Sequence, residues 1–319
     1  MKVNFFFSLG AALAVCLGAC TDDSVPSPAV NQGPLVPMTV TLDSIATKTG
    51  TGIINETSLG NGVSMGVFVE DAAGGNYDNN DSYKNLMYTS STVDQVQKWT
   101  GTDVLLSATL GKAYAYYPYM SGVADFTAIP LDVTTDNDVL YATATGTINN
   151  ASPNASFELK HALSLLSVDI VRNTYTGVGE VTAFSVKSAL ASATGSLNGK
   201  TGEITGFTGG GSEIADMGHP AALPQTLPTT DTKTVSRQLM IVPGGTGTAD
   251  PLTFKVVMDG QTYTAQTQSA VTFEQNRHYK FSLHMNGTEM TLGSVTVTEW
   301  GAGNGEGDEL HPELVVDNP

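Results

Sequence analysis

The chain has 319 residues, of which 40% are apolar and only 14% are charged, so small polar residues must build much of its surface. Its formal net charge of −17 argues against nucleic acid as a partner, because a polyanion would be repelled over most of that surface. A chain of this length is long enough for two domains of ordinary size.

Residues 1–19 have the features of a bacterial lipoprotein signal peptide. A charged flank precedes an apolar run at 5–15, which is too short to span a bilayer as a stable helix, and small residues lead up to Cys20. We therefore expect cleavage between Ala19 and Cys20 and a lipid on Cys20, in preference to an ordinary secretory signal with a chance cysteine. The other cysteine, Cys16, would leave with the signal, so the mature chain would have neither a disulfide nor a free thiol.

A tether and a short strand are predicted next. Residues 20–37 contain several prolines and little apolar material, which is typical of a flexible tether. Beyond it, Val40 and Leu42 alternate with polar residues, and Ile45 extends the apolar series. This period of two predicts a strand with one buried face.

The loop after this strand holds a candidate protease site. It is small, polar and rich in glycine, and it contains Lys48, the only basic residue between Cys20 and Lys84. A trypsin-like protease would find one accessible target here and would cut between Lys48 and Thr49. The cut would separate residues 38–48 from the rest of the fold.

The remainder of the chain is expected to be all-β. Short apolar and alternating runs recur, and almost no segment has the period of a long amphipathic helix. A polar segment at 149–156 is where we place the domain boundary, which gives an N-terminal domain at 38–152 and a C-terminal domain at 153–300. The expected strands are 62–69, 86–89, 104–110, 113–119 and 126–133 in the first domain, then 157–159, 165–171, 181–186, 238–242, 252–258, 261–266, 279–285 and 292–300 in the second.

Turn residues connect several of these strands. Asn198-Gly199, Asp259-Gly260 and Asn286-Gly287 are pairs whose positive φ angles suit two-residue β-hairpin turns. The segment 206–228 is rich in Gly and Pro and is expected to be a long exposed loop.

Residues 301–319, the tail segment, combine a glycine-rich linker with an apolar end. Glycine alternates through 301–307, and four apolar residues follow in a polar context. The tail segment is either disordered or a strand without a partner in its own chain, and thus a possible donor segment. Its apolar members are Leu310, Leu314, Val315 and Val316.

No arrangement of residues indicates an enzyme, and we expect no cofactor. The run at 195–201 is one residue short of a phosphate-binding loop and lacks its strand-then-helix context. The acidic loop from Asp71 to Asp81 offers oxygen ligands but lacks the central glycine and distal glutamate of an EF-hand. A solvated loop is therefore favoured, and a calcium site is the alternative. The five histidines never occur at zinc-ligand spacing, and His161 is expected to be a packed structural residue.

In their order along the chain, these features resemble the fimbrillin family of Bacteroidota, whose members are lipoprotein-derived pilins. The resemblance rests on the lipobox at Cys20, the first strand ending near Lys48 and a series of motifs. It implies two transthyretin-like β-sandwich domains in tandem and a protease cut after a basic residue, which is Arg in the best-known members and Lys48 here. The motifs are GVSMGVFV at 62–69, AYAYYPY at 113–119, FELKHALSLLSVDI at 157–170, NRHYKFSLHM at 276–285 and VTVTEW at 295–300.

The resemblance also implies how subunits would join. Removal of residues 38–48 would bare an apolar groove and an unpaired strand edge, which a strand from a neighbouring subunit could fill. The expected partners are therefore other fimbrial subunits, a trypsin-like maturation protease and the outer membrane through the lipid on Cys20. Either the tail segment or the strand at 292–300 could be the donor, and shaft, tip and anchor roles are not distinguished.

A second hypothesis is a lipid-anchored surface protein that binds glycans and does not polymerise. An exposed aromatic platform would favour it, and the four tyrosines within 113–119 are the candidates. The alternation there places at least half of them in a core, so the fimbrial subunit is preferred.

Overall fold

The computed structural model describes residues 33–45, 59–93, 96–135, 137–229, 234–243 and 251–300. All of the described residues belong to one compact unit. Their regular structure is almost entirely β, as expected, with two short 3₁₀ turns at Tyr77–Asn79 and Val133–Thr135. Among these residues no helix has the length and apolarity needed to cross a membrane.

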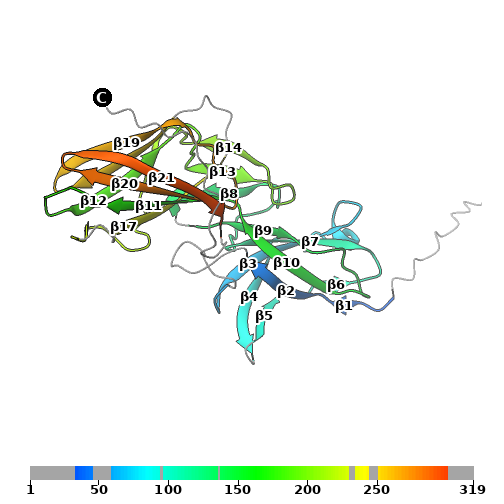
Figure 1. The fold of residues 1–319 in the computed structure, drawn as a ribbon. Helices are drawn as coiled ribbons and strands as arrows, with labels where there is room; N and C mark the ends of the chain where they lie inside the picture. The colour runs from blue at the N-terminus through cyan, green and yellow to red at the C-terminus, as the bar shows by residue number, and fades with distance from the viewer. Residues whose placement is uncertain are drawn as a thin grey trace, which may run out of the picture. The chain divides into compact units, whose positions relative to one another are not determined.

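Seven strands form the first sheet (Figure 1). Its two terminal strands, β2 and β5, contact each other, so the sheet coils around one buried apolar cluster. In sheet order the strands are β2 (Thr39–Ile45), β10 (Asn154–His161), β9 (Leu140–Thr143), β7 (Gly111–Tyr117), β3 (Ser64–Asp71), β4 (Leu86–Val93) and β5 (Val96–Gly101), while β1 (Val36–Pro37) pairs separately with β6 (Leu105–Leu106).

The second group of strands forms a β-sandwich with a small third sheet. One sheet has the order β17 (Thr234–Ile241), β11 (Ser164–Val171), β20 (Arg277–Asn286) and β21 (Glu289–Glu299). The other has the order β15 (Glu213–Ala215), β12 (Glu180–Lys187), β18 (Pro251–Met258) and β19 (Gln261–Ala270), with β16 (Gln225–Thr226) also paired to β12. The third contains β14 (Ile204–Thr208), β13 (Thr194–Leu197) and β8 (Ile129–Asp132).

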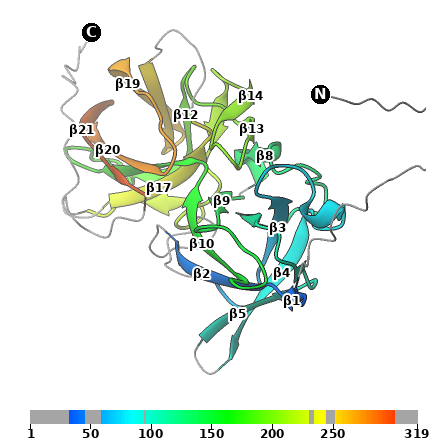
Figure 2. The same cartoon turned by 90° about the vertical axis from the view of Figure 1, so that its right-hand side faces the viewer.

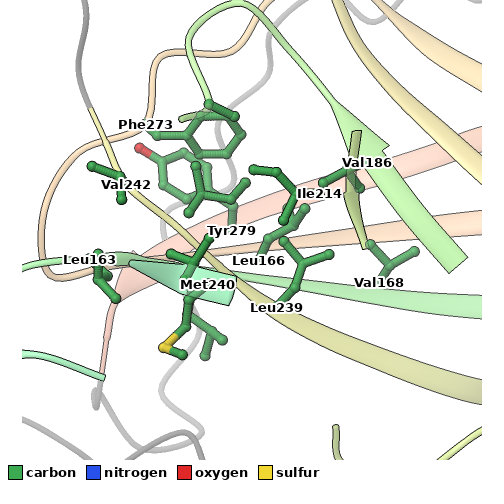
Figure 3. Close-up of a cluster of buried hydrophobic side chains, with 14 of the residues drawn as sticks. Leu163, Leu166, Val168, Val186, Ile214, Leu239, Met240, Val242, Phe273 and Tyr279 are labelled. Atoms are coloured by element: carbon green, nitrogen blue, oxygen red, sulfur yellow. The ribbon is translucent and has the colours of Figure 1, made fainter. Parts of the chain in front are cut away.

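Side chains from the two larger sheets of this group meet in its core, as Figure 3 shows. Leu166 and Leu239 come from the sheet of β11 and β17, and Val186 and Ile214 come from the sheet of β12 and β15. All four are buried. Each buried apolar side chain is worth about 1.5 to 3 kcal/mol, so this interlayer contact holds the two sheets together.

The strand expected at 157–159 in the second domain belongs instead to the first sheet. It lies within β10, which pairs with β2 and β9. The polar segment before it is a tight turn rather than a linker. The Asn149 backbone N–H donates to the Ser152 carbonyl, and the Ser152 backbone N–H donates to the Asn149 carbonyl. The position of the boundary between two domains stays a prediction.

Other expected strands also differ in place or extent. The run at 104–110 yields only the short β6, and β8 pairs with β13 rather than with the first sheet. The segment 206–228, expected to be a loop, contributes β15 and β16 to the edge of β12, where Ile214 pairs with Val186. Short edge strands such as these carry too few residues to show a clear period of two.

One of the three predicted hairpin turns has the expected form. Asp259 and Gly260 link β18 to β19 with φ angles of 48° and 75°, the left-handed values that such a turn needs. The turn after Asn198 is longer, because Leu197 pairs with Ile204. The turn near Asn286 is displaced by one residue, because Asn286 pairs with Glu289.

Candidate assembly site at the edge strand β2

Strand β2 lies at the end of the first sheet and has β10 as its only neighbour in the strand order. Figures 1 and 2 both show the two strands side by side. They run parallel, with Val40 opposite Ala155 and Ile45 opposite Leu159, and the register shifts once between Phe157 and Glu158. A terminal strand with one neighbour can leave its sheet without breaking another strand pair of that sheet, although β1, which precedes β2, would lose its own pair with β6.

The inward face of β2 is apolar. Val40 is 6% exposed and Ile45 is 2% exposed, and Leu42 is half-buried against the same cluster. The facing residues of β10, including Phe157 and Leu159, are fully buried in that cluster. The three residues that the sequence assigned to the first strand are therefore brought together on one buried face.

The outward face of β2 is polar and bonds to β10 through side chains. Thr39 Oγ1 donates to Asn154 Oδ1 at 3.0 Å, and Thr41 Oγ1 donates to Ser156 Oγ at 3.0 Å. These bonds are exposed, and each contributes only about 0.5 to 1.5 kcal/mol. Apolar burial on the inward face is thus the main side-chain contribution that holds β2.

At the far end of β10, beyond Ile45, a buried aromatic stack marks the base of the tail segment. The rings of His161 and Trp300 are parallel, with centroids 3.7 Å apart, and His161 Nδ1 lies 2.9 Å from Asp138 Oδ1. The Trp300 backbone N–H donates to the Asn276 carbonyl. His161 is fully buried, as its apolar sequence context indicated, but no local pattern pointed to its contact with Trp300.

Charged side chains surround a cavity of about 460 Å³ on the outward side of β9 and β10. Glu158, Lys160, Lys200 and Glu299 all line it, so both signs of charge are present. The Lys160 ammonium lies 5.2 Å from the centre of the Tyr141 ring, and burial raises the pKa of that tyrosine. The polar side of β10 therefore presents one acid and one base to any strand that lies along it.

The acidic loop at Asp71–Asp81 uses its polar groups within the chain. Asp81 Oδ1 accepts from Asn76 and from the Lys84 ammonium at 2.9 Å, and the lysine is the main cause that lowers the pKa of Asp81. Asp71 accepts from the backbone of the loop. Within the described ranges no group of three or more His, Cys, Asp or Glu side chains is placed to hold a metal ion.

The tyrosines of 113–119 do not form an exposed platform. Tyr114 and Tyr116 are buried, and Tyr117 and Tyr119 are half-buried. Burial raises the pKa of Tyr116 to about 12. Tyr114 and Tyr116 lie in one buried apolar cluster and Ala113 and Ala115 lie in the other, so both faces of β7 are covered.

The remaining predicted site residues lie outside the described residues. They are Ala19, Cys20, Lys48, Thr49, Leu310, Leu314, Val315 and Val316.

A family model described as fimbrillin-like matches residues 47–300 of the chain. Comparison with curated protein sequences gives no match. Among solved structures, a candidate cell adhesion protein from Bacteroides uniformis is 19% identical with a TM-score of 0.61, over 83% of this chain and 99% of that one. A candidate cell adhesion protein from Bacteroides ovatus is 18% identical with a TM-score of 0.63, over 84% of this chain and 99% of that one. These two structures share the fold of this chain.

Proposed function

The chain belongs to the fimbrillin-like family, and we propose that it is a structural or accessory subunit of a cell-surface fimbria that supports adhesion. Its assembly would be triggered by a protease and completed by donor-strand exchange. The observation that carries this proposal is the position of β2, a terminal strand held mainly by the burial of Val40, Leu42 and Ile45. A structural family of this kind also supports a non-enzymatic role.

In this proposal the protein reaches the outer membrane as a lipoprotein, anchored through Cys20. A trypsin-like protease then cuts after Lys48, and the segment that carries β2 departs. The loss exposes the side of β10 that β2 had covered, with Phe157 and Leu159 in its floor. Apolar surface and unpaired backbone groups then favour the addition of a new strand.

The new strand would come from a neighbouring subunit. Head-to-tail insertion does not close on itself, so repetition of this step gives a fibre. We propose the tail segment as the donor rather than 292–300. Those residues largely form β21, which is paired with β20 along its length and followed by the buried Trp300. Withdrawal of β21 would cost its own sheet an edge strand.

The glycan-binding alternative receives less support from the geometry. It calls for exposed aromatic faces, and Tyr114 and Tyr116 are buried. The charged cavity beside β10 has no exposed aromatic ring among the residues that line it.

The first residue of the protein recovered from assembled fimbriae tests this proposal. We expect Thr49, and we expect Lys48→Ala to abolish processing because the only basic residue of the loop is gone. Lys84→Ala is the matched control, since Lys84 is the next basic residue in the chain and its exposed side chain pairs with Asp81. Assembled material that begins only at acylated Cys20 would contradict the cleavage step.

A further inference from the structure

We infer that cleavage after Lys48 does not by itself release the cut segment. Strands β1 and β2 stay docked on the fold, and the processed subunit thereby stays on its own lipid anchor, until a strand from a neighbouring subunit displaces them. This inference rests on the proposed function and concerns the interval between cleavage and departure. It follows from contacts that hold residues 34–45 on two sides.

One side of the segment is held by β6. Strand β1 pairs with it in the antiparallel direction, with Val36 opposite Leu106 (Figure 1). The contact extends one residue beyond β1, because the Met38 backbone N–H donates to the Val104 carbonyl at 2.8 Å. These bonds involve neither β10 nor the loop at Lys48, so a cut in that loop leaves them intact.

The other side of the segment is held by β10. The change of neighbour occurs at Thr39, whose backbone N–H donates to the Pro153 carbonyl at 2.9 Å, and β2 pairs with β10 from that residue onward. Strand β2 also contacts β5, the strand that precedes β6 in the chain. The segment therefore lies between β10 and the strands β5 and β6, and not on an open edge.

Apolar burial accompanies the backbone pairing along the whole segment. Met38, Val40 and Ile45 are buried in one cluster with Val104 and Leu106, which are fully buried. All of the residues that the segment contributes to this cluster precede the proposed cut. Departure would expose their apolar surface and that of their partners to water, which is unfavourable.

The two contacts support each other because they belong to one piece of chain. When β2 separates from β10, the pairing of β1 with β6 still keeps it close, so its return is an intramolecular step. Linked contacts of this kind hold a ligand roughly 10²- to 10⁴-fold more tightly than either contact alone. The segment should therefore remain bound after the chain is cut.

The docked segment would also carry the anchor. Cys20, the proposed lipid attachment site, lies on the same side of the cut as β1 and β2. A docked segment is then a non-covalent link between the processed subunit and the outer membrane. An incoming strand that displaces it would fill the groove and free the subunit from the membrane in one step, so cleavage permits release and strand exchange causes it.

Vesicle flotation tests the inference. The lipidated full chain is bound to phosphatidylcholine vesicles, with the recognition sequence of a sequence-specific protease in place of residues 46–52, so that the cut does not depend on the natural enzyme. After complete cutting, the part of the chain that follows the cut should still float with the vesicles. Val36→Asp places a carboxylate at a half-buried position opposite Leu106 and should release about tenfold or more of that part than the wild type does.

Leu35→Asp is the matched control. It adds the same charge at the neighbouring position, where the side chain is 55% exposed, and should be retained like the wild type. Circular dichroism of uncut Val36→Asp checks that the variant is folded. Release of the wild-type chain as soon as it is cut would overturn the inference, and so would equal retention of Val36→Asp and the wild type.

Hydrogen exchange on the wild-type residues of the segment gives an independent check. The Met38 amide, which bonds to Val104, should exchange in the cut protein within about tenfold of its rate in the uncut protein. Exchange at the rate of an unstructured peptide would overturn the inference. If fimbriae begin at Thr49 but the cut segment leaves at once, only this inference fails, whereas fimbriae that begin elsewhere contradict the proposed cleavage and leave the docking intact.

Discussion

At the scale of single residues, burial sets the protonation of His278. Its side chain is largely covered, and its Nε2 atom lies 2.7 Å from Ser167 Oγ. Burial is the main cause that lowers the pKa of His278 to about 4, and the Lys280 ammonium adds to it, while Asp169 acts in the opposite direction. The folded chain therefore keeps this imidazole neutral under mildly acidic conditions.

His278 should make the folded state less stable in acid. Its pKa is lower in the folded chain than in the unfolded chain, so the unfolded chain binds the proton first as the pH falls from about 6.5 to about 4. The free energy of unfolding should drop on the order of 2 kcal/mol from this residue between about pH 7 and pH 4.5. Urea unfolding of the wild type and of His278→Asn at both pH values measures this drop, because the variant lacks the imidazole that causes it. An equal drop in the free energy of unfolding in both proteins would show that His278 is not its source.

At the scale of one element, β2 combines an apolar inward face with weak outward bonds. Val40 and Ile45 are buried, whereas the hydroxyl of Thr41 bonds to Ser156 on the exposed side. A substitution on the inward face should therefore cost far more than one on the outward face. That difference should exist only while β2 is part of the fold.

Ile45→Ala should lower the free energy of unfolding of the uncut chain by roughly 2 to 4 kcal/mol, because it removes a buried branched side chain. Thr41→Ala is the control and should cost less than about 1.5 kcal/mol. Denaturation before and after cleavage at Lys48, with the cut segment removed, measures both. If Ile45→Ala destabilises the processed protein equally, β2 has not left the fold.

At the scale of the whole molecule, the proposed function gives one groove beside β10 two occupants in turn. These are β2 in the uncut chain and a strand from a neighbouring subunit in the fibre. Both must present apolar side chains to the same buried face, which includes Phe157 and Leu159. Competition for one face would make polymerisation depend on cleavage.

A substitution in the tail segment tests the proposed donor. If the tail segment is the donor, Leu314→Asp places a charge on one of its apolar residues and should prevent polymer ladders, because burial of an unpaired carboxylate is costly. Asp317→Asn lies outside the four apolar donor residues, is the control and should leave the ladders unchanged. Gels of protease-matured protein measure both outcomes, and normal ladders from Leu314→Asp would exclude the tail segment as the donor.

Local properties of the sequence were sufficient for the class of fold and for several of its parts. The alternation at Val40 and Leu42 indicated a half-buried strand, and the Asp259-Gly260 pair indicated a tight hairpin. The apolar context of His161 indicated a packed side chain. Each of these follows from periodicity or turn chemistry among a few adjacent residues, which sequence displays directly.

Tertiary structure alone decided which segments meet. The pairing of β2 with β10, the placement of β8 beside β13 and the stacking of Trp300 on His161 all join residues far apart in the chain. A strand's own sequence specifies which face is buried, but many strands offer an equally apolar face as a neighbour. The choice among them depends on the combined packing and backbone pairing of the whole sheet, which no local pattern contains.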